Sequence, residues 1–104
     1  MGPMVRLLVL YNKPRDPAAF ERYYREVHIP LAKKMPELKR CTISRHVAPV
    51  GGGDAYYLVA ELDWDDLGAF GRAMQSPQGQ ATAQDVPKFA TGGVTMQTYE
   101  VEEI

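Results

Sequence analysis

The sequence predicts a single α+β domain over residues 4–104, with a four-stranded antiparallel sheet and helices on one face. Strand-like and helix-like segments follow the order β-α-β-β-α-β, with an extra helix before the final strand. The segments "DPAAFER" (16–22) and "DLGAFGR" (66–72) share Asp, Ala, Phe and Arg at identical spacing, as two equivalent β-α-β halves would. These features are typical of a ferredoxin-like sandwich. Residues 1–3 precede Met4, the expected natural start, and are set aside as added residues.

The first half of the chain is predicted to form a strand and then a helix. "MVRLLVLYN" (4–12) is a compact run rich in Val and Leu, typical of a strand covered on both faces. Asp16 and Pro17 mark a helix start, with an acceptor side chain at the N-cap and proline in the first turn. Pro30 is expected to break or kink this helix because proline lacks an N–H, and Pro36 to end the short turn that follows.

The second half begins with a predicted hairpin. "LKRCTISRHVAPV" (38–50) and "AYYLVAELDW" (55–64) are strand-like runs joined by the flexible "GGGD" turn. Asp65 or Asp66 is expected to cap the next helix. A third helical piece is predicted from Ser76–Pro77 up to Pro87, and "VTMQTYEV" (94–101) is the predicted last strand.

Helices on one face would leave the other face of the sheet bare. The first strand is apolar in both alternating sets, with Val5, Leu7, Val9 and Tyr11 on one side and Leu8 and Leu10 on the other. An exposed apolar surface of that extent indicates an association surface. We therefore expect a homodimer whose two sheets pack face to face into an α+β barrel.

Composition excludes several classes of partner. Twelve basic and thirteen acidic side chains give a net charge of −1, which offers nothing to attract nucleic acid or an anionic membrane. A single cysteine, Cys41, cannot form an internal disulfide and is typical of a reducing compartment. The sequence shows no leader-like segment and no apolar run near the ~20 residues of a membrane span. The expected location is the cytoplasm.

Two motifs resemble the EthD-like proteins of the dimeric α+β barrel superfamily. "FERYYREVHIPLAKKMPELKR" (20–40) contains Tyr-x-x-x-His-x-Pro-Leu, and "SPQGQATAQDVPKF" (76–89) is similar to the second-half signature of that family. The resemblance covers the chain from Met4 onward. It implies the barrel fold and carries over Tyr24, His28 and Pro30 as shared positions, without a catalytic assignment.

What the resemblance implies about function is broad. The family name comes from a gene cluster for ethyl tert-butyl ether degradation, in which the small protein accompanies a cytochrome P450 system. Relatives on the same barrel include cofactor-free monooxygenases, muconolactone isomerases, polyketide cyclases and dehydratases. The fold alone therefore does not define the reaction.

His28 is the first candidate catalytic residue. It follows Tyr24 by one helical turn, so the two side chains share a face, and its imidazole could act as acid or base on a phenol, enol or lactone. The alternative is a histidine that caps the helix carbonyls freed by Pro30. His46, in phase with Ser44 on the predicted second strand, is a further catalytic candidate.

Four other residues are candidates for substrate contact: Tyr11, Asn12, Pro30 and Leu31. Aromatic side chains with a polar tip suit a pocket for a planar hydrophobic ligand, although they also suit a core or a dimer interface. Asn12 could orient a carbonyl or form a turn. Asp85 is interpreted as the end of a helix. The two histidines show neither HxxxH nor HxH spacing and no phosphate-binding loop is present, so neither a metal nor a cofactor is expected.

The sequence leaves three functions open. The first is a small cofactor-independent enzyme of catabolism or secondary metabolism, of the monooxygenase, isomerase or dehydratase type, acting on an aromatic, quinone-like or lactone substrate. The second is a non-catalytic accessory protein that holds a small hydrophobic molecule for an oxygenase system. The third is a purely structural dimer module.

Overall fold

The computed structural model describes residues 4–104, and within them four strands form one antiparallel sheet in the order β2-β3-β1-β4. The strands are β1 (Met4–Tyr11), β2 (Arg40–Ile43), β3 (Leu58–Trp64) and β4 (Val94–Val101). β1 and β3, at the centre, pair antiparallel with Tyr11 opposite Leu58. The ferredoxin-like sandwich predicted from the sequence is therefore confirmed. No helix in residues 4–104 is long and apolar enough to cross a bilayer.

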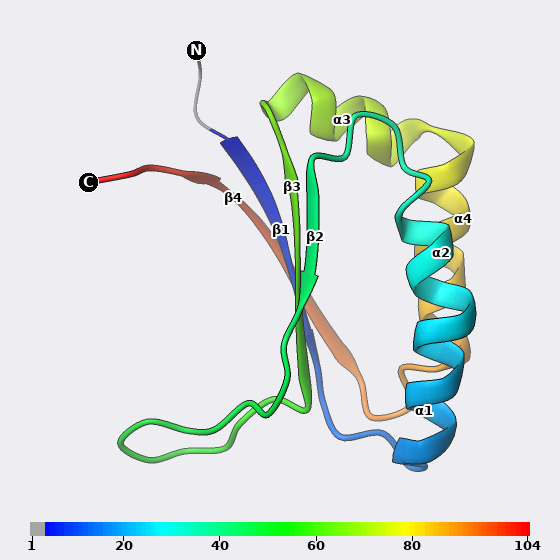
Figure 1. Cartoon of the computed structure of the whole chain (residues 1–104), viewed down its shortest axis with the longest axis vertical. Helices are drawn as coiled ribbons and strands as arrows, with labels where there is room; N and C mark the ends of the chain where they lie inside the picture. Colours follow the sequence, from blue (N-terminus) through cyan, green and yellow to red (C-terminus); the bar gives the residue numbers. More distant parts are fainter. Residues whose placement is uncertain (1–3) are drawn as a thin grey trace.

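The helices all lie on one face of the sheet (Figure 1). They are α1 (Pro17–Tyr23), a π-helical turn η1 (Tyr24–His28), α2 (Ile29–Ala32), α3 (Leu67–Gln75), α4 (Pro77–Asp85) and the 3-10 turn η2 (Val86–Lys88). The two repeated segments begin their helices in the same way. Asp16 accepts a hydrogen bond from the backbone N–H of Ala19, and Asp66 accepts one from Ala69. The expected N-caps are confirmed, with Asp66 rather than Asp65 at the second.

Pro30 does not break the first helix, so of the two outcomes expected from sequence, a break or a kink, the break is wrong. The helix continues through Ala32 because the backbone widens into a π turn just before the proline, and the N–H of Ile29 bonds the carbonyl of Tyr24. In regular α geometry the proline ring would collide with the carbonyl four residues earlier. A π turn is one of the recognised local adjustments within a helix.

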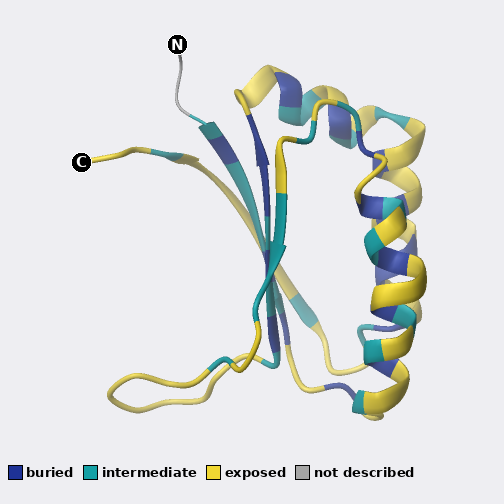
Figure 2. Ribbon diagram, viewed as in Figure 1, coloured by how far each residue is buried: buried dark blue, intermediate teal, exposed yellow. Residues whose placement is uncertain are grey.

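The predicted second strand over 38–50 is wrong beyond Ile43. β2 spans Arg40–Ile43, and β3 begins at Leu58 rather than at residue 55. Residues 44–57 form a long loop that projects away from the helices (Figure 1) and is exposed along most of its length (Figure 2). Pairing with β3 ends at Ser44, whose N–H bonds the Val59 carbonyl at 2.7 Å, and His46 has a positive φ of 24°, which is outside strand geometry.

The core lies between the sheet and the helices. Its largest members include Trp64, Tyr11 and Phe20, at 0%, 1% and 2% exposure. The opposite face of the sheet is less apolar than expected. Leu8 is paired with Glu61 across β1 and β3, and the next pair on that face joins Arg6 to Asp63 through two hydrogen bonds of 2.8 and 3.2 Å. The open face thus carries charged side chains, Glu61 and the Arg6–Asp63 pair, beside its apolar ones.

Candidate functional site

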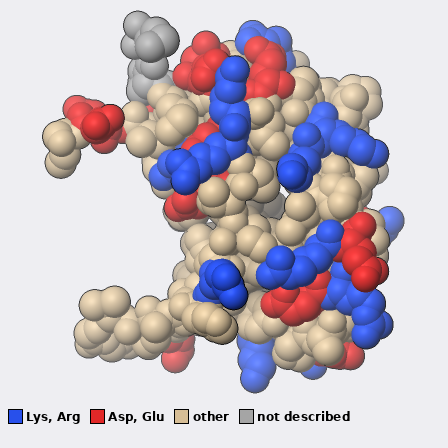
Figure 3. All heavy atoms as spheres, viewed as in Figure 1, with Lys and Arg blue, Asp and Glu red and all other residues tan. Residues whose placement is uncertain are grey.

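A small cavity lies between the sheet and the helix layer, with a volume of about 80 Å³. Its wall joins side chains from β1, β2, β3 and β4 to side chains from the π turn, α2, α3 and α4. Figure 3 shows the face of the molecule hollowed between the sheet and the helices. Met96 on β4 lines the cavity but remains 52% exposed, so the cavity also approaches the surface beside that strand.

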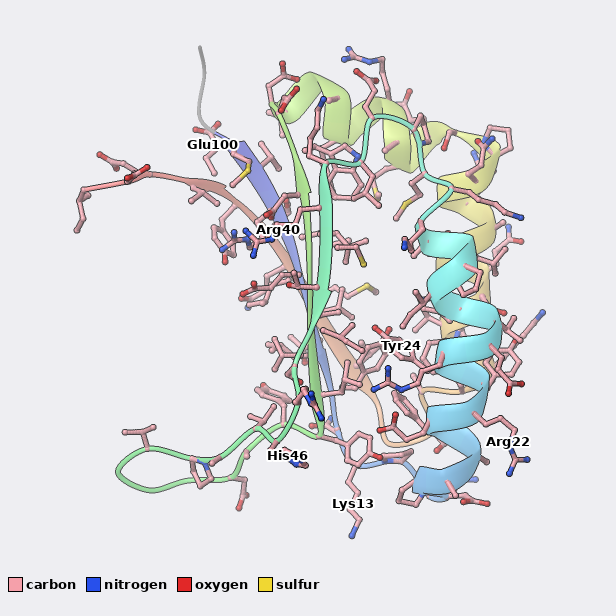
Figure 4. The ribbon with its side chains drawn as sticks, viewed as in Figure 1. Lys13, Arg22, Tyr24, Arg40, His46 and Glu100 are labelled. Carbon is pink, nitrogen blue, oxygen red and sulfur yellow. The ribbon has the colours of Figure 1, made fainter. Side chains whose placement is uncertain are left out.

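Three of the residues predicted from sequence meet at this cavity: Tyr11 from β1, with Tyr24 and His28 from the π turn. The rings of Tyr24 and His28 stack with centroids 5.5 Å apart, and Tyr11 meets Tyr24 edge-on at the same distance. Figure 4 shows Tyr24 directed from the helix toward the sheet. The π turn thus places adjacent aromatic rings on one wall.

The imidazole of His28 is buried and held by a carboxylate. His28 is 5% exposed, and its Nδ1 lies 3.0 Å from Oδ2 of Asp85, which is itself 4% exposed. The other carboxylate oxygen accepts a 2.6 Å hydrogen bond from the Tyr23 hydroxyl. A carboxylate at Nδ1 fixes the tautomer with its proton there, and so leaves Nε2 as the nitrogen available to the cavity.

Electrostatics keep this pair in defined protonation states. Burial lowers the pKa of His28 and outweighs the opposing hydrogen bond and charge of Asp85. Burial alone would raise the pKa of Asp85, but the hydrogen bonds from Tyr23 and His28 dominate and lower it. Lys88 adds a positive charge, with Nζ 3.9 Å from Oδ1 of Asp85. At neutral pH the arrangement is therefore a neutral imidazole backed by an ionised carboxylate.

The tyrosines remain protonated. Burial raises the pKa of Tyr11 and of Tyr24 well above the ordinary value for a phenol. The neutral hydroxyls are consequently hydrogen-bond donors rather than bases. Burial also raises the pKa of the Cys41 thiol, which β2 contributes to the cavity wall. Among the ionisable groups of the wall, His28 is the one suited to accept a proton at neutral pH.

The other predicted site residues lie elsewhere. His46 is not on a strand: it is exposed in the 44–57 loop with a φ of 24°, in a separate open groove (Figure 4). Asn12 is exposed at the end of β1, where its backbone N–H bonds the Gly93 carbonyl at 3.0 Å. Pro30 is exposed and Leu31 half-buried, and neither belongs to the cavity wall.

Sequence reasoning missed the importance of Asp85 and Tyr23. Asp85 was assigned only to the end of a helix, which it is, since α4 ends there. The second motif that resembles the EthD-like proteins contains Asp85, so a signal was present. Contact between residues 28 and 85 cannot be derived from spacing, because it depends on how α4 packs beside the π turn. Among residues 4–104, no three His, Cys, Asp or Glu side chains are grouped to hold a metal ion.

Comparison with known proteins agrees with this architecture. The chain is 40% identical over 93 residues to an uncharacterised 11.0 kDa protein in the thcB-thcC intergenic region of Rhodococcus erythropolis, covering 89% of this chain and 90% of that protein. It superposes with a TM-score of 0.87 on the crystal structure of an ethyl tert-butyl ether D (EthD) family protein from Bacillus halodurans, at 34% identity and with 95% of this chain and 99% of that chain covered.

Proteins with much lower sequence identity share the fold alone. A dimeric ferredoxin-like protein of unknown function from Thermobifida fusca superposes with a TM-score of 0.71 at 14% identity, covering 97% of this chain and 93% of that chain.

Residues 12–93 match the EthD domain. With most of its length in that match and a 40% identical relative, this chain belongs to the EthD family.

Proposed function

We propose that the protein is a small enzyme that needs no cofactor and moves a proton on an apolar ring substrate bound in the cavity. The observation that carries the proposal is the His28–Asp85 pair, buried at the wall of an apolar cavity with Nδ1 held by the carboxylate. A neutral imidazole with a pKa below its usual value can accept a proton at physiological pH. The substrate class that fits is the aromatic, quinone-like or lactone class.

The proposed mechanism assigns each group one role. Nε2 of His28 takes a proton from a phenol O–H or from a carbon next to a carbonyl. The imidazolium that forms is stabilised by Asp85, and Tyr11 and Tyr24 donate hydrogen bonds to the oxygen on which negative charge develops. Return of the proton to another carbon would give an isomerase, and departure of a neighbouring hydroxyl as water, with the proton supplied by His28, would give a dehydratase. Addition of the carbon anion to dioxygen, with the proton returned by His28, would give a hydroperoxide; loss of water from it would leave one oxygen atom on the substrate, as in a monooxygenase. His46, Asn12, Pro30 and Leu31 have no role in this mechanism.

We also propose that the protein is a homodimer, with the open face of its sheet against that of a second copy. Leu8, Leu10 and Val59 lie on this face and are only half-buried in the single chain. The description of the Thermobifida fusca structure as dimeric supports the proposal. Sedimentation at micromolar concentration tests it, and a monomer under those conditions would rule it out.

A thermal-shift screen tests the enzymatic proposal. Wild type, His28→Gln and His46→Ala are compared against phenols, quinones and small lactones, and each hit is then assayed for turnover by chromatography. Gln keeps a donor for Asp85, and His46→Ala removes the exposed histidine as a matched control. A ligand at about 100 times its dissociation constant adds ~2.7 kcal/mol, which for a domain of this size is roughly ten degrees or more.

The expected result is a hit that persists in His46→Ala and is lost in His28→Gln. Hits that persist equally in both variants would place binding elsewhere and refute the proposed site. The second candidate function is an accessory protein that holds such a molecule for an oxygenase system, as the history of the family name suggests. Binding at His28 without turnover by this protein alone would favour that candidate.

A further inference from the structure

From the wall of the cavity we infer a limit on its ligand: the site accepts an uncharged molecule no larger than a single small ring, and rejects carboxylates and fused rings. The inference rests on the proposed function for the location of the site. It goes beyond that function by narrowing the substrate to a charge and a size.

The charge limit follows from the chemistry of the wall. Among the described residues 4–104, none that lines the cavity is Lys, Arg, Asp or Glu. Asp85 lies directly behind His28 and contributes a negative charge just outside the wall. The cations near the wall lie outside it on exposed residues: Arg25 of the π turn, Lys33 just after α2, and Lys88, whose Nζ is 3.9 Å from Asp85. At neutral pH, where His28 is uncharged, a buried anion would lose its hydration with no cation on the wall to replace it, a cost that neutral ligands avoid.

The size limit follows from the volume and the stiffness of the wall. About 80 Å³ is roughly half the ~150 Å³ of an engineered apolar cavity that binds benzene. On the side of α4 the wall cannot move back, because α3 and α4 are in backbone contact. A Cβ on Gly79 would lie 2.0 Å from the carbonyl oxygen of Ala73. The cavity can grow instead by rearrangement of Met35, Met74 and Met96, which are flexible side chains.

Flexible methionines therefore set the upper bound. Their rearrangement supplies room for one ring, whereas two fused rings would require the backbone of the helix pair to move. The aromatic polar groups of the wall, Tyr11, Tyr24 and His28, gather on one side, while the Thr82 hydroxyl already donates to the Gln78 carbonyl. The ring should therefore carry one oxygen or amide toward the aromatic groups. Such a ligand satisfies the polar side of the cavity and buries its remaining atoms against apolar side chains.

Two matched pairs of compounds test the two limits separately. Benzamide and benzoate have nearly the same shape but differ in charge, and phenol and 1-naphthol differ by one fused ring. Each is titrated into the wild-type protein while the imidazole signals of His28 and His46 are followed by NMR. His46, exposed in the 44–57 loop, is an internal control for binding outside the cavity.

We expect benzamide and phenol to shift the His28 signals saturably and to leave those of His46 in place. Benzoate should bind at least tenfold more weakly than benzamide, and 1-naphthol at least tenfold more weakly than phenol. Equal affinity within the first pair overturns the charge limit, and equal affinity within the second overturns the size limit, while the proposed site stands in both cases. Failure of both neutral single-ring compounds to move His28 overturns the inference and the proposed site together.

Enlarged variants test whether the methionines set the bound. Met74→Ala, and independently Met96→Ala at a half-exposed position, should each raise the affinity for 1-naphthol at least tenfold and leave phenol binding measurable. Met4→Ala, at the start of β1 and outside the cavity wall, is the matched control and should change neither affinity. Two folded variants that gain no affinity for 1-naphthol would refute the size argument.

Discussion

Replacing Asp85 by Asn tests the central pair directly. The substitution removes a negative charge from the carboxylate that lies 3.0 Å from Nδ1 of His28, and keeps an oxygen acceptor of nearly the same size. In the wild type, burial lowers the pKa of His28 while Asp85 raises it. With the negative charge gone, only an uncharged oxygen acceptor opposes the effect of burial, so the pKa of His28 should fall further.

The structure sets the scale of that fall. Two unit charges about 4 Å apart interact by ~4 kcal/mol at an effective dielectric constant of 20, which corresponds to roughly three pKa units. That figure is an upper bound, because the site approaches the surface and the protein relaxes after substitution. We expect a decrease of at least one unit in the pKa of His28 in Asp85→Asn.

The assay is an NMR titration of the two imidazoles, with His46 as the internal control. Its pKa should be the same in the wild type and in Asp85→Asn, because it lies in a different groove. Tyr23→Phe provides a graded comparison: it removes one hydrogen bond to Asp85 but leaves the charge, so the effect on His28 should be smaller. A pKa of His28 that is unchanged or higher in Asp85→Asn would show that the carboxylate does not act on the imidazole.

Three further predictions concern stability and access. Folding lowers the pKa of His28, so below about pH 6.5 the unfolded chain binds more protons than the folded protein. The free energy of unfolding should therefore decrease as the pH falls below about 6.5, and it should decrease less in His28→Gln. Urea titrations at several pH values measure both changes. Gly79→Ala forces a Cβ against the backbone of Ala73 and should lower the free energy of unfolding by about 2 kcal/mol or more. Gly71→Ala, whose added Cβ has no atom within 4 Å, should leave stability unchanged or raise it. Equal effects of the two variants in thermal unfolding would contradict the packing of α3 against α4. A ligand that occupies the cavity should slow labelling of Cys41 by a small thiol reagent, and an unchanged rate at saturation would place the ligand elsewhere.

Much of the fold could be predicted because the signals were local. Asp16 with Pro17 begins one helix and Asp66 begins another, each through a side chain that accepts an N–H three residues later. The last strand occupies the predicted range 94–101. The second strand was overextended because its alternating pattern continues to Val47 while its pairing with β3 ends near Ser44. Alternation describes which residues could face one way, not whether a neighbouring strand is present.

The site was predicted only in part because one of its contacts joins residues that are far apart in the sequence. Tyr24 and His28 are one helical turn apart, so their proximity could be derived from the chain itself. Asp85 is 57 residues away from His28, and its contact depends on the packing of α4 beside the first helix. Sequence patterns gave no measure of that packing.

The π turn before Pro30 has a consequence for how this region can vary. The turn contains one residue more than a regular helix would need, and proline supplies no N–H that could restore the regular hydrogen-bond register. Pro30, which is exposed and lies outside the cavity wall, thus fixes the angular position of His28 because it has no backbone N–H to donate. Loss of a single residue between Tyr24 and Pro30 would rotate the imidazole relative to Asp85 while the helix persisted. Length in this segment should therefore be under stricter constraint than side-chain identity on its outer face.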